Sequence, residues 1–94
     1  MTTRAQILDE ARQAVTVDRA AIHGGVEETF GLIAAYWSAH LDHDVTATDV
    51  AVMMTLLKLA RTRATPAHMD HWVDIAGYAA CGGELSVPPE GAVT

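Results

Sequence analysis

The charged residues with the clearest chemical meaning lie inside two apolar segments. Asp74 is embedded in an apolar run at residues 71–80, and Lys58 and Arg61 lie in a second run at residues 53–61. A charge among apolar residues is costly to bury unless it is paired, hydrogen-bonded or bound to a metal. The opposite signs of these charges therefore predict a polar site between two helices, with Asp74 facing Lys58 or Arg61.

Each of these charges has both a structural and a functional interpretation. Asp74 either forms a structural ion pair or holds Mg²⁺ or a polar group of a ligand. Lys58 and Arg61 are three residues apart and share a helix face. A cation at a helix C-terminus is explained by the helix dipole, which suits Arg61 better than Lys58. Phosphate binding is therefore the sharper hypothesis for the pair.

Further candidates lie at the start of the predicted helix at residues 26–41. Glu27 and Glu28 suit a helix N-terminus, where acids are favoured. The apolar stripe of that helix, extended back by one turn, reaches Glu27, which indicates a possible metal ligand on the core side. The segment just before has amides that could cradle a phosphate, and its candidate residues are Arg19, His23 and Gly24.

Other potential ligands form no pattern specific enough to predict a site. Histidines and aspartates cluster at residues 40–44, and His68 and His71 are three apart, but zinc needs ligands that converge from several segments. Cys81 has no patterned base nearby, and the sequence has neither Gly-x-Ser-x-Gly nor a phosphate-loop motif. We therefore expect neither a zinc site nor nucleophilic catalysis.

Four helices are predicted to position these side chains, so the expected fold class is all-α. Apolar residues at helical spacing predict helices at about residues 3–17, 26–41 and 47–62, and from residue 66 or 70 to about residue 85. A Thr-x-x-Asp pattern at residues 46–49 indicates a helix cap. The composition, with 50% hydrophobic residues, 3 Pro and 7 Gly, favours helices over strands.

The length of 94 residues allows one small domain. We expect it to span residues 1–85, with a loose tail at residues 86–94 that has turn residues and no pattern. The predicted helix at residues 47–62 is apolar nearly all round. A chain this short can hardly surround such a helix, so we expect a homo-oligomer.

The overall charge and the single cysteine limit the possible partners and compartments. A formal net charge of -6 argues against nucleic acid polymers and anionic membranes as partners, although it leaves small phosphorylated ligands open. No apolar run reaches the ~18 residues of a membrane span, and one cysteine fits a reducing compartment. We expect a soluble cytoplasmic protein, located in the host cytoplasm if a phage encodes it.

Taken together, these motifs resemble a small family of phage and prophage domains of unassigned function. The resemblance covers about residues 4–85. Its motifs are Arg19 before His23-Gly24, the Glu27-Glu28-Thr-Phe start, Trp37, Asp49 before the Lys-x-x-Arg helix end at residues 58–61, and Trp-Val-Asp-Ile-Ala-Gly-Tyr-Ala at residues 72–79. His23 stands where the family more often has Tyr.

That family is similar in turn to the all-α nucleoside triphosphate pyrophosphohydrolases of the MazG type. This likeness implies a small four-helix unit completed by oligomerisation to a dimer or tetramer. It also implies Mg²⁺-assisted attack of water on a (deoxy)nucleoside triphosphate, which releases pyrophosphate and a monophosphate. The implied metal ligands are Glu27, Glu28, Asp70 and Asp74, of which Glu27, Glu28 and Asp74 are the catalytic candidates. The implied nucleotide-binding residues are Arg19, His23, Gly24, Lys58, Arg61, Trp72 and Tyr78.

The chain departs from the MazG pattern in its acidic residues. MazG-type enzymes carry Glu-x-x-Glu and then Glu-x-x-Asp, whereas this chain has adjacent Glu27-Glu28 and no Glu-x-x-Asp. Asp70 and Asp74 form a substitute pair if both are helical. Two alternatives to hydrolysis therefore stay open. One is an oligomer that binds a nucleotide or nucleotide-derived signal without hydrolysis, and the other is a structural oligomer in which Lys58–Asp74 is only a salt bridge.

Overall fold

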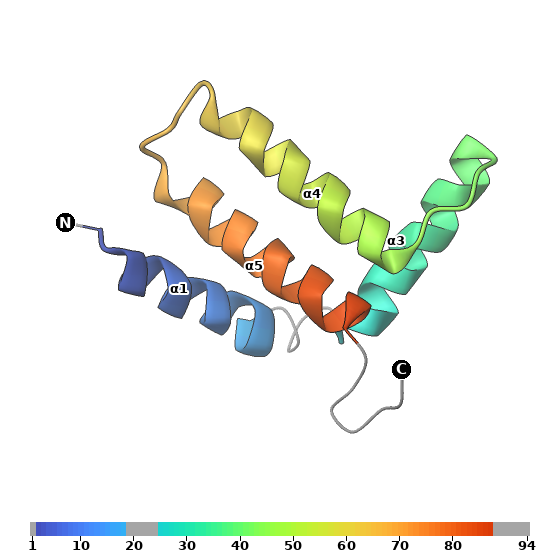
Figure 1. The fold of residues 1–94 in the computed structure, drawn as a ribbon, viewed down its shortest axis with the longest axis horizontal. Coiled ribbons are helices and arrows are strands. Elements are labelled where there is room, and N and C mark those ends of the chain that lie inside the picture. Colours follow the sequence, from blue (N-terminus) through green and yellow to red (C-terminus); the bar gives the residue numbers. More distant parts are fainter. Residues whose placement is uncertain (1, 19–24, 88–94) are drawn as a thin grey trace.

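The computed structural model shows an all-α chain, as the sequence predicts (Figure 1). It describes residues 2–18 and 25–87, and for Asp18 only the backbone. The elements in this part of the chain are α1 (Arg4–Gln13), the π-helical turn η1 (Ala14–Asp18), α3 (Val26–Leu41), α4 (Ala47–Thr62) and α5 (Met69–Ser86). None of these helices is long and apolar enough to cross a membrane.

The predicted bounds of α3 and α4 are confirmed at both ends, and the other two helices differ slightly. The first predicted helix changes from α to π geometry after Gln13. The last helix begins at Met69 with His68 as its N-cap residue, so Asp70 lies in the first turn. It continues to Ser86, one residue past the predicted domain end. Residues 88–94 of the predicted tail lie outside the described residues, so the division of the chain stays a prediction.

Local side-chain hydrogen bonds fix where α1 and α4 begin. The Thr3 hydroxyl accepts a hydrogen bond from the Gln6 amide, and the Gln6 side chain accepts one from the Thr3 amide. Thr46 and Asp49 form the same reciprocal pair at α4, as predicted, at 3.0 and 2.9 Å. The hydrogen bonds from Thr46 lower the pKa of the Asp49 carboxyl below its ordinary value. These boxes satisfy amides that a helix start leaves without partners.

Helix α5 lies in the middle of a row of three helices. Figure 1 shows α4 along one side of α5 and α1 along the other, with α3 crossing the end of the row. Glycines allow these close approaches. A Cβ atom added at Gly77 would lie 3.0 Å from Val15 Cγ1, and one at Gly82 would lie 3.1 Å from Ala51 Cβ. The close neighbour of Gly77 thus belongs to η1.

The main core lies where α3, α4 and the C-terminal half of α5 meet. Its buried members are Phe30, Ala34, Val50, Ala51 and Cys81. Ile33 and Trp37 of α3 pack against it, whereas Leu41 in the last turn of that helix is exposed. The small size of most core side chains matches a composition with few aromatic residues.

A candidate site at the seam of α4 and α5

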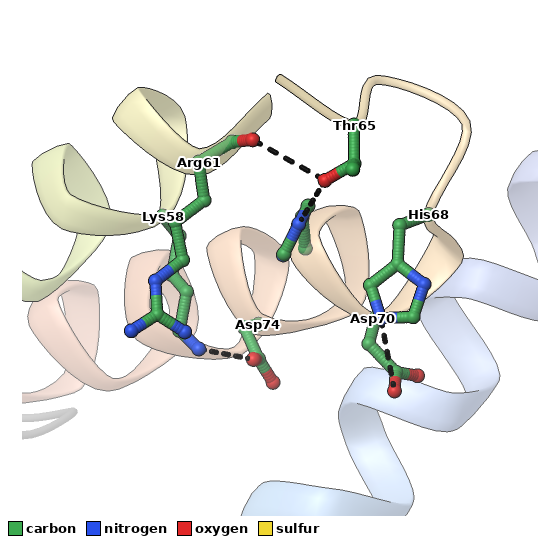
Figure 2. Close-up of polar contacts among 7 residues, drawn as sticks. Lys58, Arg61, Thr65, His68, Asp70 and Asp74 are labelled. Atoms are coloured by element: carbon green, nitrogen blue, oxygen red, sulfur yellow. Dashed lines mark hydrogen bonds and ion pairs between the residues drawn. The ribbon is translucent and has the colours of Figure 1, made fainter. Parts of the chain in front are cut away.

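Lys58 and Asp74 form an ion pair across the seam between α4 and α5. The distance between Lys58 Nζ and Asp74 Oδ2 is 2.9 Å, and the side chains are 15% and 39% exposed (Figure 2). The prediction that Asp74 faces one of two cations is confirmed, and Lys58 is that cation. Because the lysine is largely covered and the aspartate is not, part of the carboxylate stays open to solvent and to ligands.

The inner side of Asp74 has little free space. A hollow of about 20 Å³ lies against it, lined by residues of η1 and α5 that include Val15, Gly77 and Cys81. Such a volume holds about one water molecule. A ligand of Asp74 must therefore approach from the solvent side of the seam.

Arg61 brings a second cation to the same end of the seam. It lies one turn after Lys58, and Figure 2 shows its side chain extending toward α5 alongside the lysine. Arg61 is exposed. Lys58 and Asp74 neutralise each other, whereas Arg61 has no ion-pair partner among the side chains that the structure describes. This end of the seam therefore carries a positive charge in an otherwise acidic protein.

Polar groups of the turn between α4 and α5 lie next to these charges. The Thr65 hydroxyl is 2.8 Å from His71 Nε2 and 3.4 Å from the Arg61 carbonyl oxygen. The His68 and His71 rings meet edge to face, with centroids 4.8 Å apart. Thr65 and His71 have no role in the sequence-based site. Their position on both sides of the predicted boundary at Pro66 is the signal that could have found them.

The two predicted aromatic residues lie in different places. The Trp72 indole N–H donates to the Pro66 carbonyl oxygen at 2.8 Å. Trp72 is two residues from Asp74 in α5, and residues at that spacing do not share a helix face. The Tyr78 ring is half-buried and lies 6.2 Å from the Phe30 ring, so it belongs to the core. Trp72 is therefore not placed beside a base held at Asp74, whereas Tyr78, four residues after Asp74, lines the small hollow against that carboxylate.

The four predicted magnesium ligands do not gather in the single chain. Asp70 is 73% exposed, and its carboxylate lies 3.7 Å from His68. Glu27 and Glu28 line an open hollow of about 470 Å³ together with Glu84. Asp74 and Glu84 are ten residues apart in α5, about 15 Å along the axis. Within residues 2–18 and 25–87, no three His, Cys, Asp or Glu side chains are placed to hold a metal ion.

The predicted core-side position of Glu27 is wrong. Glu27 is exposed in the first turn of α3, and the preceding residue, Val26, packs against the core instead. Glu84 was missed by the sequence reasoning because only the fold brings the end of α5 to the start of α3. Three of the predicted phosphate-binding residues lie outside the described residues, namely Arg19, His23 and Gly24.

Comparison with known proteins identifies the family. A family model described as "Domain of unknown function (DUF6378)" matches residues 6–86. The Gene 55 protein of Mycobacterium phage D29 is 39% identical over 75 residues, which are 80% of this chain and 50% of that protein. The Gene 55 protein of Mycobacterium phage L5 is 39% identical over 85 residues, 89% of this chain and 54% of that protein. The chain therefore belongs to the DUF6378 family and is similar to proteins of two mycobacteriophages.

These matches cover only part of the phage relatives. The chain spans about half the length of the phage relatives that it matches. No solved structure matches it. The predicted phage family is confirmed, whereas the further likeness to MazG-type enzymes finds no support in these matches and stays a prediction.

Proposed function

We propose that this DUF6378 domain binds a phosphate-bearing small molecule of the nucleotide class at the Lys58–Asp74 seam, without hydrolysing it. The observation that carries the proposal is the unneutralised Arg61 beside the Lys58–Asp74 pair. A guanidinium offers two parallel N–H donors to a phosphate, which gives both charge and geometry. The overall negative charge makes this local cation more selective for a small anion than for a nucleic acid polymer.

The remaining groups of the seam suit the non-phosphate part of a nucleotide. Asp74 uses Oδ2 for Lys58, so its second oxygen can accept a hydrogen bond from a ribose hydroxyl or an exocyclic amine. Thr65 contacts both the Arg61 carbonyl oxygen and the His71 ring, and the two side chains supply further hydrogen-bonding groups. The predicted relation of the family to nucleotide-handling enzymes is the reason to place nucleotides first among phosphate-bearing ligands.

Binding without hydrolysis agrees best with where the acids lie. Hydrolysis of the MazG kind needs several carboxylates around Mg²⁺. In this chain Asp74 is engaged with Lys58, and Glu27 and Glu28 lie at the other end of α5 beside Glu84. A binding function requires only the seam.

The test is a screen of nucleotides and cyclic dinucleotides by thermal shift, followed by calorimetry with and without Mg²⁺. We expect at least one ligand to bind without metal, and Arg61→Ala to weaken its binding about tenfold or more, as loss of a charged hydrogen bond does. Arg4→Ala, which removes an exposed cation of α1, is the matched control and should leave the affinity unchanged. Equal binding by native protein and Arg61→Ala would remove the seam from consideration.

A Mg²⁺-dependent pyrophosphohydrolase is the second candidate, and the acidic hollow favours it. Three carboxylates, Glu27, Glu28 and Glu84, line one space of about 470 Å³, although within residues 2–18 and 25–87 they are not placed to hold one metal ion together. Such a space repels a triphosphate unless a divalent cation neutralises part of the charge. If this function holds, native protein with Mg²⁺ releases pyrophosphate from at least one nucleoside triphosphate, and Glu27→Gln abolishes the release. Chelation of the metal should have the same effect. If no nucleoside triphosphate in a full panel releases pyrophosphate, the enzyme hypothesis is rejected, whereas the binding hypothesis is not affected.

A further inference from the structure

Helix α4 exposes an apolar face that the described part of the chain leaves uncovered. Val50 and Ala51 are buried on one side of the helix, while the other side carries what we call the α4 stripe, formed by Val52, Met53, Leu56, Leu59 and Ala60. Leu56 at its centre is 57% exposed. Contiguous exposed apolar residues of this kind mark interaction surfaces. The spacing of three and four residues is that of a helix face which packs on another helix.

The two ends of the α4 stripe carry opposite charges. Asp49 precedes Val52 by three residues, and Arg63 follows Leu59 by four, so both continue the same spacing. Both are exposed, and neither forms an ion pair with another residue in residues 2–18 or 25–87. Asp49 uses Oδ2 for the helix cap, which leaves its other oxygen open. Leu56 is seven residues from each charged end.

We propose that two copies of the chain pair through the α4 stripe in antiparallel orientation, with a two-fold axis at Leu56. In this arrangement Asp49 of each copy faces the partner's Arg63, and the two Leu56 side chains meet at the axis. A parallel pair in register would instead place Asp49 against Asp49 and Arg63 against Arg63. Charge complementarity therefore selects both the partner, a second copy, and its direction, and it gives the closed symmetry of most dimers.

A groove beside the stripe fits this pairing. It has a volume of about 250 Å³ and lies between α4 and α5, lined by residues that include Val52, Thr55 and Gly82. The antiparallel register brings the partner's Leu59 to the level of Met53, on the flank where the groove opens. The small residues of α5 that shape the groove thus leave space for a partner side chain. This pairing does not depend on the ligand proposed above.

Analytical ultracentrifugation of the full chain tests the proposal. We expect the native protein to sediment as a dimer. The Leu56→Glu variant should sediment as a monomer, because it places two carboxylates at the axis, and its helical circular dichroism spectrum should be unchanged. Leu32→Glu alters a similarly exposed leucine on α3 and is the matched control that should remain dimeric. A native monomer at roughly 100 μM, or a dimer lost in Leu32→Glu but kept in Leu56→Glu, would overturn the proposal.

Disulfide cross-linking tests the antiparallel direction of the two α4 helices. This test does not require a variant that fails to dimerise. Val52 and Ala60 are equally distant from Leu56, so antiparallel pairing places Val52 opposite the partner's Ala60. Mixed Val52→Cys and Ala60→Cys chains should cross-link on oxidation. Each variant alone should not, because its two cysteines are separated by about 12 Å along the helix. The native Cys81 is buried and does not compete. Cross-linking of Ala60→Cys with itself would show parallel pairing and contradict the proposal.

Discussion

At the scale of single residues, the ion pair between Lys58 and Asp74 is unequal. Lys58 is 15% exposed and Asp74 is 39% exposed, so removal of one partner does not have the same effect as removal of the other. An ammonium left largely covered without its carboxylate is destabilising, whereas a half-exposed carboxylate left alone is hydrated by solvent. This difference separates a structural role of the pair from a purely ligand-binding one.

We predict that Asp74→Asn lowers the free energy of unfolding by about 1–3 kcal/mol, and that Lys58→Met lowers it by less. The double variant should recover part of the loss, because it leaves no uncompensated charge. Urea unfolding of the four proteins in a double-mutant cycle measures the coupling. Zero coupling would mean that the 2.9 Å contact contributes nothing to stability and that the seam is maintained for a ligand alone.

The sequence predicts Asp74 as a polar-site residue because opposite charges within two apolar helices are costly to bury unless they pair with each other or with a ligand. It did not predict which cation pairs with Asp74, since Lys58 and Arg61 lie on one helix face and the choice depends on how α4 and α5 align. The error at Glu27 has the same origin. The stripe of α3 was extended by periodicity, but the core ends at Val26, where the helix meets the hollow shared with Glu84.

At the scale of helices, local chemistry made α4 predictable. The Thr46–Asp49 box sets its first residue, and the polar loop before it ends α3 at Leu41. The packing of the helices was not predictable, because it depends on contacts between residues far apart in the sequence. Gly77 illustrates this point: only the fold shows that its close neighbour is Val15, 62 residues earlier in the chain.

Gly77 therefore offers a test of packing against helix propensity. Replacing a glycine inside a helix by alanine typically stabilises it by about 1 kcal/mol. At Gly77 the new methyl group would lie 3.0 Å from Val15 Cγ1, so the Val15 side chain must move by a few tenths of an ångström. We predict that Gly77→Ala gains nothing or destabilises the protein, and that Val15→Ala partly relieves the effect.

Gly31 in α3 is the matched control for this prediction. Within residues 2–18 and 25–87, and apart from the nearby backbone of α3 itself, no atom lies within 4 Å of a Cβ built there. Gly31→Ala should therefore raise the free energy of unfolding by about 1 kcal/mol. Thermal or urea unfolding of each variant measures both effects. Equal stabilisation at the two positions would show that α5 and η1 pack less closely than the structure indicates.

At the scale of the whole molecule, the described core is small for a stable fold. Its fully buried large side chains, within residues 2–18 and 25–87, are Phe30 and Val50. Small domains bury a modest fraction of their surface and gain much from association. The apolar character of the helix at residues 47–62 predicts an oligomer from the sequence, but which face is exposed and which charges lie at its ends are seen only in the fold.

The ligand seam and the α4 stripe lie on different sides of α4, and this separation leads to a prediction about the assembled protein. Lys58 turns toward α5 and pairs with Asp74, whereas Leu56 is exposed on the stripe. Changes at sites without shared contacts act independently. We therefore expect Leu56→Glu monomers to bind the nucleotide identified in the screen with an affinity within about threefold of the native value. Arg61→Ala should weaken ligand binding and leave the dimer intact.

Calorimetry and ultracentrifugation on the same preparations measure both properties. A stoichiometry of one ligand per chain in both native protein and Leu56→Glu would support two separate surfaces. If Leu56→Glu instead abolished ligand binding while its helical content stayed native, the partner chain would have to supply part of the site. The acids at Glu27, Glu28 and Glu84, which lie away from Asp74 within one chain, would then be the first residues to substitute in search of that contribution.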